Sequence, residues 1–384
     1  MERRDFLKLS ALAPFAGMTG LARAAADPGV HRLLVLVELK GGNDGLNTVV
    51  PFADPRYAEL RPRLAIPREQ VIHLTEREGL HPSLAPLKPA WDAAELAVVR
   101  GVGYPAPNLS HFRSIEIWDT ASRSDEYLDE GWLARAFEAA PRPASYAADG
   151  VVVGMGGMGP LAGRKVRALA LANPGQFVRN AGLAHREEAR SRNASLEHIL
   201  HVENEIAASA QRLRGATREF QTEFPPGPFG ASVRAAAQLA ANPAGIAVVR
   251  LSLGSFDTHA NQLPVQANLL RQLAEGLAAL RSALTEAGLW KSTVIATYAE
   301  FGRRARENES GGTDHGTASA HFVLGGAVHG GLHGAAPSLD RLDADGNVLH
   351  TVDFRSYYAT FLERCWGIDS QAVLGGRFTL LEIV

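Results

Sequence analysis

The chain has 384 residues, which is enough for one large α/β domain or two ordinary ones. Its hydrophobic fraction of 46% and charged fraction of 21% are typical of soluble globular proteins. A formal net charge of -2 without a long basic run gives no reason to expect a nucleic acid partner. Cys365 is the single cysteine, so the composition excludes an intrachain disulfide and a thiolate metal cluster.

The N-terminus has the pattern of an export signal. Arg3-Arg4 precedes a modestly apolar run over residues 9–21, and small residues follow over 22–26. This predicts a twin-arginine signal peptide at 1–26, handled by the twin-arginine export machinery, with cleavage after Ala24 and after Ala26 both acceptable. The alternative is a disordered start that happens to contain Arg-Arg. The apolar run is too short to span a bilayer and no second run has membrane length, so we expect a periplasmic or secreted protein without a stable membrane anchor.

Apolar runs at 33–39, 96–99, 245–253 and 293–299 are typical of strands buried on both faces of a parallel sheet. Shorter runs at 151–154 and 167–172 predict two more strands. Helical spacing follows at 81–91, after 110, and at 132–139, 187–220 and 265–287. The pair His198 and His201 on the fourth of these is interpreted as solvated surface. The pattern predicts a single α/β domain over 27–384, with a mainly parallel central sheet and helices on both faces.

The loop after the first strand carries Asp44 between Asn43 and Asn47, in a glycine-rich turn. In open α/β sheets, ligands bind beyond the carboxyl ends of the strands, which makes Asp44 a candidate metal ligand. Asn-Asp-Gly is also strong turn chemistry by itself.

Ser110 stands at the expected start of a helix and is either an N-cap or a nucleophile. A helix N-terminus favours an alkoxide and an incoming anion. Arg113, one turn further on, can grip a phosphate or sulfate through two N–H groups.

Acidic and imidazole side chains recur at the other strand ends. Asp257 and His259 follow the third strong strand, Glu300 ends the fourth, and a glycine-bounded segment carries Asp314-His315 with His321 six residues later. If the strands are parallel, these ends share one edge of the sheet. So many carboxylates at one edge would repel one another unless cations were present. Asp and His are ligands that borderline divalent metals accept, so we expect a metal site here.

These motifs together resemble the alkaline-phosphatase-like superfamily, which includes sulfatases, and more closely the exported domain-of-unknown-function 1501 family. The resemblance covers nearly the whole mature chain. It is carried by six segments: 41–48, 110–114, 256–259, 300–303, 313–316 and the region of Asp353-Phe354-Arg355.

The resemblance implies a two-metal hydrolase of small anionic phosphate or sulfate esters, with Ser110 attacking in line and Arg113 holding the remaining oxygens. The metals are divalent, with Zn, Mn, Mg and Ca all open. The implied ligands are Asp44, Ser110, Asp314 and His315 for one ion, and Asp257, His259 and a later histidine for the other, first His321 and then His333 or His350. The Asp-x-His spacing is tighter than the superfamily's usual one, and the sulfatase signature around a converted nucleophile is missing. Two alternatives stay open: a non-catalytic, metal-containing secreted binding or assembly protein, and a metal-free serine hydrolase.

Overall fold

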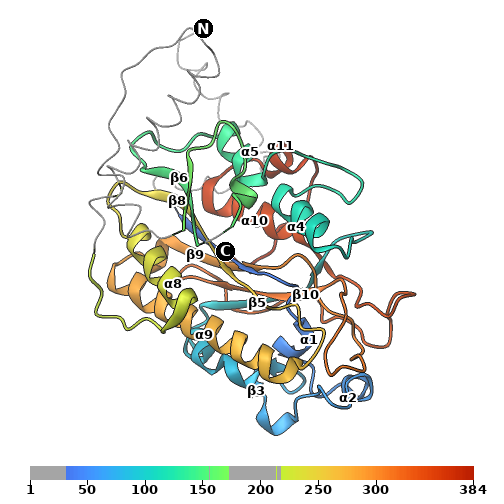
Figure 1. Cartoon of the computed structure of the whole chain (residues 1–384). Helices are drawn as coiled ribbons and strands as arrows, with labels where there is room; N and C mark the ends of the chain where they lie inside the picture. Colours follow the sequence, from blue (N-terminus) through green and yellow to red (C-terminus); the bar gives the residue numbers. More distant parts are fainter. Residues whose placement is uncertain (1–31, 155, 173–212, 214–217) are drawn as a thin grey trace, which may run out of the picture.

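The structure is a computed structural model that describes residues 32–154, 156–172, 213 and 218–384. The signal peptide expected at 1–26 lies outside the described residues, and so does most of the helix expected at 187–220, with His198 and His201. Figure 1 shows the described part as a central sheet with helices packed on both of its faces.

The sheet is mainly parallel, as the sequence predicts. Its strand order is β11-β5-β10-β9-β1-β8-β6-β7, with β12 beside β5, and β10 alone runs antiparallel to its neighbours. The strands are β1 Leu33–Leu39, β5 Leu96–Gly103, β6 Ala148–Val153, β7 Ala168–Leu171, β8 Ile246–Leu253, β9 Thr293–Tyr298, β10 Ser319–Leu324, β11 Gly331–His333 and β12 Val352–Asp353. A small antiparallel sheet, β2-β4-β3, is formed by β2 Val49–Val50, β3 Ile72–His73 and β4 Gly79–Leu80.

Successive residues of a strand point to opposite faces, and both faces of β1 are covered. Val35 and Val37 belong to one core cluster with the helices at Gly227–Ala240 (α8) and Gln262–Glu286 (α9). Leu34 and Leu36 belong to another with the helices at His111–Thr120 (α4), Trp132–Ala139 (α5) and Phe354–Trp366 (α10). Strand β1 is therefore a continuous apolar run instead of an alternating one.

The helices confirm the expected layers, with some differences in their bounds. The α-helices are α1 Gly45–Thr48, α2 Pro55–Leu60, α3 Lys88–Asp92, α4 His111–Thr120, α5 Trp132–Ala139, α8 Gly227–Ala240, α9 Gln262–Glu286, α10 Phe354–Trp366 and α11 Ser370–Leu374. Short 3-10 helices are η2 Arg68–Gln70, η3 Pro82–Leu87, η4 Gly159–Leu161 and η5 Trp290–Ser292. The helix expected at 81–91 divides into η3 and α3, with Pro86 inside the 3-10 segment. Among the described helices, none combines the length and the apolar character that a membrane span requires.

One edge of the sheet collects the loops that carry the candidate site residues. The carboxyl ends of β1, β5, β8 and β9 meet there because these strands run in the same direction. Asp314 and His315 reach the same edge by a different route than the sequence suggests. They precede β10, and this antiparallel strand begins where its neighbours end.

Candidate metal centre

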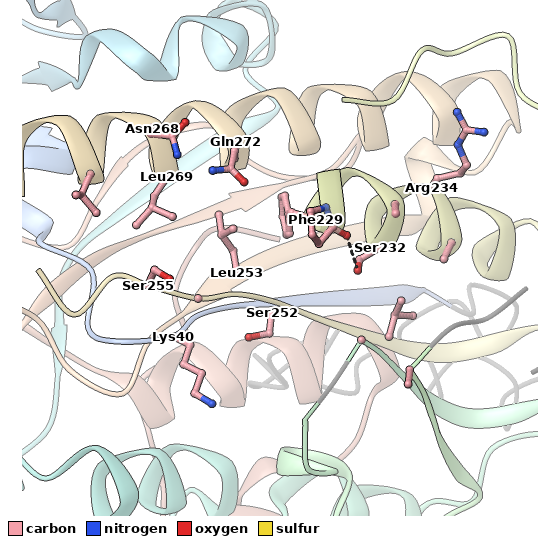
Figure 2. Close-up of a pocket in the computed structure, with 18 of the residues that line it drawn as sticks. Lys40, Phe229, Ser232, Arg234, Ser252, Leu253, Ser255, Asn268, Leu269 and Gln272 are labelled. Carbon is pink, nitrogen blue, oxygen red and sulfur yellow. Dashed lines mark hydrogen bonds between the residues drawn. The ribbon is translucent and has the colours of Figure 1, made fainter. Parts of the chain in front are cut away.

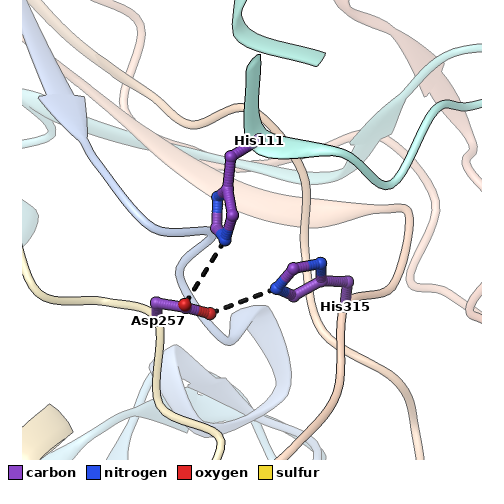
Figure 3. Close-up of side chains that lie close together, drawn as sticks. All are labelled: His111, Asp257 and His315. Atoms are coloured by element: carbon purple, nitrogen blue, oxygen red, sulfur yellow. Dashed lines mark hydrogen bonds and ion pairs between the residues drawn. The ribbon is translucent and has the colours of Figure 1, made fainter. Parts of the chain in front are cut away.

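Three side chains from three loops converge at this edge. His111 begins α4, Asp257 follows β8, and His315 precedes β10 (Figure 3). His111 Nε2 lies 3.4 Å from Asp257 Oδ2, and His315 Nε2 lies 3.2 Å from Asp257 Oδ1. One ligand atom from each residue lies within 4.8 Å of the others, so the group can hold a metal ion.

His259 adjoins the same group through its Nε2 atom. This atom lies 3.1 Å from Asp257 Oδ1 and 2.9 Å from His315 Nε2. Ligand atoms at about 2.1 Å from a tetrahedral zinc ion lie about 3.4 Å from one another. The separations between the converging atoms are close to that value.

The other ring nitrogen of each histidine already has an acceptor. His111 Nδ1 donates to Glu300 Oε1 at 2.8 Å, and His259 Nδ1 donates to Asp314 Oδ1 at 3.2 Å. His315 Nδ1 donates to the Leu109 carbonyl oxygen at 2.8 Å. Carboxylate and carbonyl oxygens only accept, so each Nδ1 carries a proton, and Nε2 is the ring nitrogen that remains for a metal. Three such Nε2 atoms lie beside the Asp257 carboxylate.

The charges around the group keep it suited to a cation. Burial would raise the pKa of Asp257, but the hydrogen bond and charge of Arg303, whose guanidinium lies 2.6 Å away, lower it to about 2. Burial lowers the pKa of His315, and the Arg303 charge lowers it further. At neutral pH, Asp257 is therefore an anion and His315 a neutral ring.

Glycines let the loops approach closely enough to form the site. A Cβ atom at Gly41 would lie 2.4 Å from Asp257 N, and one at Gly312 would lie 2.3 Å from the carbonyl carbon of His259. Both distances are shorter than side chains tolerate. Arg303 then ties the loops together by donating to the carbonyl oxygens of Gly42 and Thr313 at 2.7 and 2.9 Å.

Glu300 and Asp314 lie in the site but act on the histidines. Glu300 is buried, and its Oε1 accepts from Gly41 N at 2.9 Å as well as from His111. Asp314 Oδ1 also accepts from Asn308 Nδ2 at 3.2 Å. A carboxylate that holds the outer nitrogen of a histidine fixes its tautomer and orientation. Both residues therefore fit a supporting role better than the ligand role that the sequence predicts.

Asp44 is committed to other partners. Its side chain caps α1 by accepting from Leu46 N, and its carboxylate pairs with Arg61 at 2.5 and 3.0 Å. Gln262 donates to it as well, and all of these groups are buried. The carboxylate's charge and lone pairs are satisfied inside the protein, so this placement does not support the prediction of Asp44 as a metal ligand.

Ser110 and Arg113, the two candidates predicted on this helix, have different surroundings in the structure. Ser110 is the N-cap residue of α4, but its exposed side chain makes no capping hydrogen bond. Arg113 donates to the carbonyl oxygens of the 123–126 loop, pairs with Glu116 at 2.9 Å and stacks on Tyr127. The guanidinium therefore holds a loop, which gives no support to its expected grip on an anion. The Ser110 hydroxyl has no hydrogen-bond partner in the described part of the chain.

His321 lies in the core on the face of α4 and α10. It is fully buried, its ring stands edge-on to Trp118 at 5.5 Å, and neither ring nitrogen has a partner among the described residues. His333 Nε2 donates to the His329 carbonyl oxygen, and His350 packs beside Gly103. No contact joins these three histidines to the converging group in the described structure, so the expected final ligand has no support here.

The histidine that the sequence reasoning missed is His111. The prediction for this segment rests on Ser110, which precedes His111, and on Arg113, two residues after it. One signal is present: an imidazole at the first position of a helix that opens at the ligand-binding edge of the sheet. Which of these three polar residues faces the site depends on the helix rotation, and a single sequence does not specify that rotation.

The family model of the protein of unknown function DUF1501 matches residues 90–377. The chain belongs to the DUF1501 family. No curated protein matches the sequence.

Solved structures similar to this DUF1501 chain include the C-terminal periplasmic domain of EcEptC from Escherichia coli in complex with Zn. The match to that domain has 11% sequence identity and a TM-score of 0.40, and it covers 77% of this chain and 73% of the domain's chain. The PsFucS1 sulfatase from Pseudoalteromonas sp. is 10% identical, with coverages of 94% and 74% and a TM-score of 0.38. The phosphonate monoester hydrolase SpPMH from Silicibacter pomeroyi is 10% identical, with coverages of 90% and 77% and a TM-score of 0.39.

Proposed function

We propose that this DUF1501 protein is a metal-dependent hydrolase of phosphate or sulfate esters, with a divalent ion held by His111, Asp257, His259 and His315. The observation that carries the proposal is the direction of the lone pairs. Three histidines have Nδ1 bound to acceptors, and their Nε2 atoms lie 3.1–3.4 Å from the oxygens of one carboxylate, that of Asp257. Without a cation, His259 Nε2 and His315 Nε2 would face each other with like dipoles.

The donor set favours zinc among the divalent ions. Imidazole nitrogen suits zinc, whereas magnesium and calcium prefer sites made of oxygen atoms. The sequence resemblance implies two ions with separate ligand sets. The geometry supports one shared cluster instead, because Asp257 and His259 lie with His315.

A bound divalent ion would supply positive charge that stabilises the anionic transition state of ester hydrolysis. The chain's own residues prepare the site. Glu300 and Asp314 fix the rings of His111 and His259, and Arg303 keeps Asp257 ionised. Ser110 is the candidate nucleophile because its hydroxyl is exposed at the N-terminus of the ten-residue helix α4, where the helix dipole favours negative charge.

The two alternatives fit the geometry less well. A metal-free serine hydrolase needs a histidine nitrogen free to take the serine proton. Both nitrogens of His111, the neighbour of Ser110, already contact Glu300 and Asp257. A non-catalytic metal protein would share the ion site, and the turnover measurement below separates it from the hydrolase.

The test combines elemental analysis with a panel of small phosphate and sulfate esters. We expect near-stoichiometric zinc in the mature protein, with metal and turnover both lost in Asp257→Ala/His315→Ala. His333→Ala is the matched control because this ring bonds only to a backbone carbonyl oxygen among the described residues, and it should keep both. A wild-type protein that takes up no divalent metal on dialysis would exclude the proposal. Metal without turnover of any ester would favour the binding protein.

We also propose that the chain is exported by the twin-arginine route and works in the periplasm or outside the cell. The support is the sequence of residues 1–26, with its Arg3-Arg4 head. Replacing both arginines by lysine should leave the protein in the cytoplasm, as fractionation and immunoblotting would show. Unchanged export of that variant would refute the route.

A further inference from the structure

A groove of about 1120 Å³ opens beside the metal centre, between α8, α9 and the carboxyl end of β8. Figure 2 shows Asn268, Leu269 and Gln272 on α9, opposite Ser252 and Leu253 of β8, with Lys40 beyond the end of β1. Ligand pockets usually measure about 300–1,000 Å³. The groove is therefore far larger than a phosphate or sulfate group requires.

The groove and the metal centre share their loops. Lys40 precedes Gly41, whose N–H binds Glu300, and Ser255 and Asn261 each lie two residues from a proposed ligand. The loops are tied at this point, since Lys40 N donates to the Leu253 carbonyl oxygen at 3.0 Å and Phe256 N donates to the Lys40 carbonyl oxygen at 3.1 Å. The groove therefore adjoins the loops that carry the proposed ligands Asp257 and His259.

The lining has a definite chemical character. No carboxylate lines the groove in the described part of the chain, and its charged residues there are Lys40 and Arg234. Most of the other polar groups are amides and hydroxyls, and the apolar part includes Phe229 and Leu269. Amides and hydroxyls both donate and accept, which matches the hydroxyl groups of a ligand. A cationic ligand finds no counter-charge here.

These polar groups are also available. Among the described residues, the side chains of Lys40, Ser252, Ser255, Asn261 and Gln272 have no hydrogen bond or ion pair. Asn268 accepts from Arg271 at 2.8 Å and keeps its amide N–H groups free. The wall of the groove therefore offers donors and acceptors to a ligand.

The backbone at the mouth of the groove is unusual. Ser255 has φ +79° and Asn261 has φ +49°, on either side of the loop that carries Asp257 and His259. Left-handed conformations are uncommon outside glycine, and residues held in them cluster at ligand-binding and catalytic sites. Both residues line the groove. The strain therefore lies where the groove meets the metal centre.

We propose that the groove binds the alcohol part of the ester, and that this part is an anionic, hydroxyl-rich chain: an acidic saccharide longer than one unit. This proposal rests on the proposed function, because the metal centre would hold the ester group at one end of the chain. The uncharged donors and acceptors of the groove suit the hydroxyl groups of a sugar ring. Its apolar surface suits the apolar side of the same ring. The cations Lys40 and Arg234 suit further anionic groups along the chain.

The test is a binding measurement that does not depend on turnover. A fluorescent sulfated dextran oligosaccharide is titrated with the mature protein, its Asn268→Ala/Gln272→Ala variant and Ser282→Ala. The first variant removes two polar groups from the groove side of α9, where alanine keeps the helix. Ser282 is exposed on the same helix outside the groove, which makes Ser282→Ala the matched control. Unsulfated dextran of equal length and polyaspartate of equal charge are the competing probes.

We expect the double variant to bind sulfated dextran about tenfold more weakly, as the loss of two hydrogen bonds implies. Ser282→Ala should bind like the wild type, and both competing probes should bind more weakly than sulfated dextran. Equal affinity in wild type and double variant would overturn the groove as the binding site. Polyaspartate binding as tightly as sulfated dextran would overturn the saccharide class.

Hydrolysis of 4-nitrophenyl phosphate and sulfate is measured separately on the same proteins. These small esters test the metal centre without the groove, so the wild type and the Ser282→Ala control should hydrolyse them equally. If neither the wild type nor the variants hydrolyse these esters, the proposed function fails. The binding measurement still decides whether the groove is the saccharide-binding site.

Discussion

His321 offers a decisive test of which histidines belong to the metal centre. The sequence reasoning made it the final ligand, whereas the structure buries it beside Trp118 with both ring nitrogens unpartnered among the described residues. The perturbation is His321→Leu, which replaces the ring by an apolar side chain. If His321 bound the metal, its replacement would lower the metal content of the protein. If it is a core residue, the metal content stays unchanged.

Burial also makes His321 a source of acid sensitivity. Desolvation lowers its pKa from 6.5 to about 3. Between these values the unfolded chain binds a proton that the folded protein does not, so stability is full above pH 6.5 and falls as the pH drops toward 3. At pH 5 the shift spans about 1.5 units, which at 1.36 kcal/mol per unit corresponds to a loss of about 2 kcal/mol.

The assay is urea unfolding of the parent and of His321→Leu at pH 7.5 and pH 5, with metal content measured on both. We expect the parent to lose about 2 kcal/mol more than the variant between the two pH values. Burial also lowers the pKa of His81, to about 4, but His81 is present in both proteins and cancels in the comparison. Loss of metal in the variant, or an identical pH dependence in both proteins, would refute the reasoning.

Four further variants test the rest of the site. Glu300→Gln should weaken metal affinity about 10- to 100-fold, because the side chain would hold the ring of His111 less firmly. Asp257→Asn should weaken metal affinity more. Competition with a fluorescent chelator measures both affinities. Arg61→Leu leaves the buried Asp44 charge unpaired and should cost about 3–5 kcal/mol in urea unfolding without loss of metal. Arg113→Ala should speed proteolysis of the loop it holds and leave KM for small esters unchanged; a raised KM would restore its role in anion binding.

The edge of the sheet could be predicted because its signals are local. Apolar runs identified the parallel strands, and the polar residues after them could meet only at one edge. That reasoning placed Asp257, His259, Asp314 and His315 together, and the structure brings them together. The antiparallel direction of β10 did not disturb the result, because a segment before such a strand reaches the same edge.

The site predictions that the geometry does not support concern partners that are distant in sequence or orientations that a sequence does not specify. Arg61 lies in a stretch without a regular hydrophobic pattern, so nothing in the sequence indicates that it neutralises Asp44. His321 is inside a strand whose two faces are both covered, so its side chain is buried whichever face it points to. His111 was missed for the complementary reason, since its place depends on the rotation of α4.

The same geometry links metal binding to the stability of the whole edge. The four proposed ligands come from the loops after β5 and β8 and before β10, and Glu300, after β9, holds one of them. In the unfolded chain these segments are far apart and offer no common site. An ion that binds only the folded state stabilises it by mass action, by about 2.7 kcal/mol at one hundred times its Kd. Metal removal should therefore loosen all these loops together. Its effect should not be confined to the chemistry at one residue.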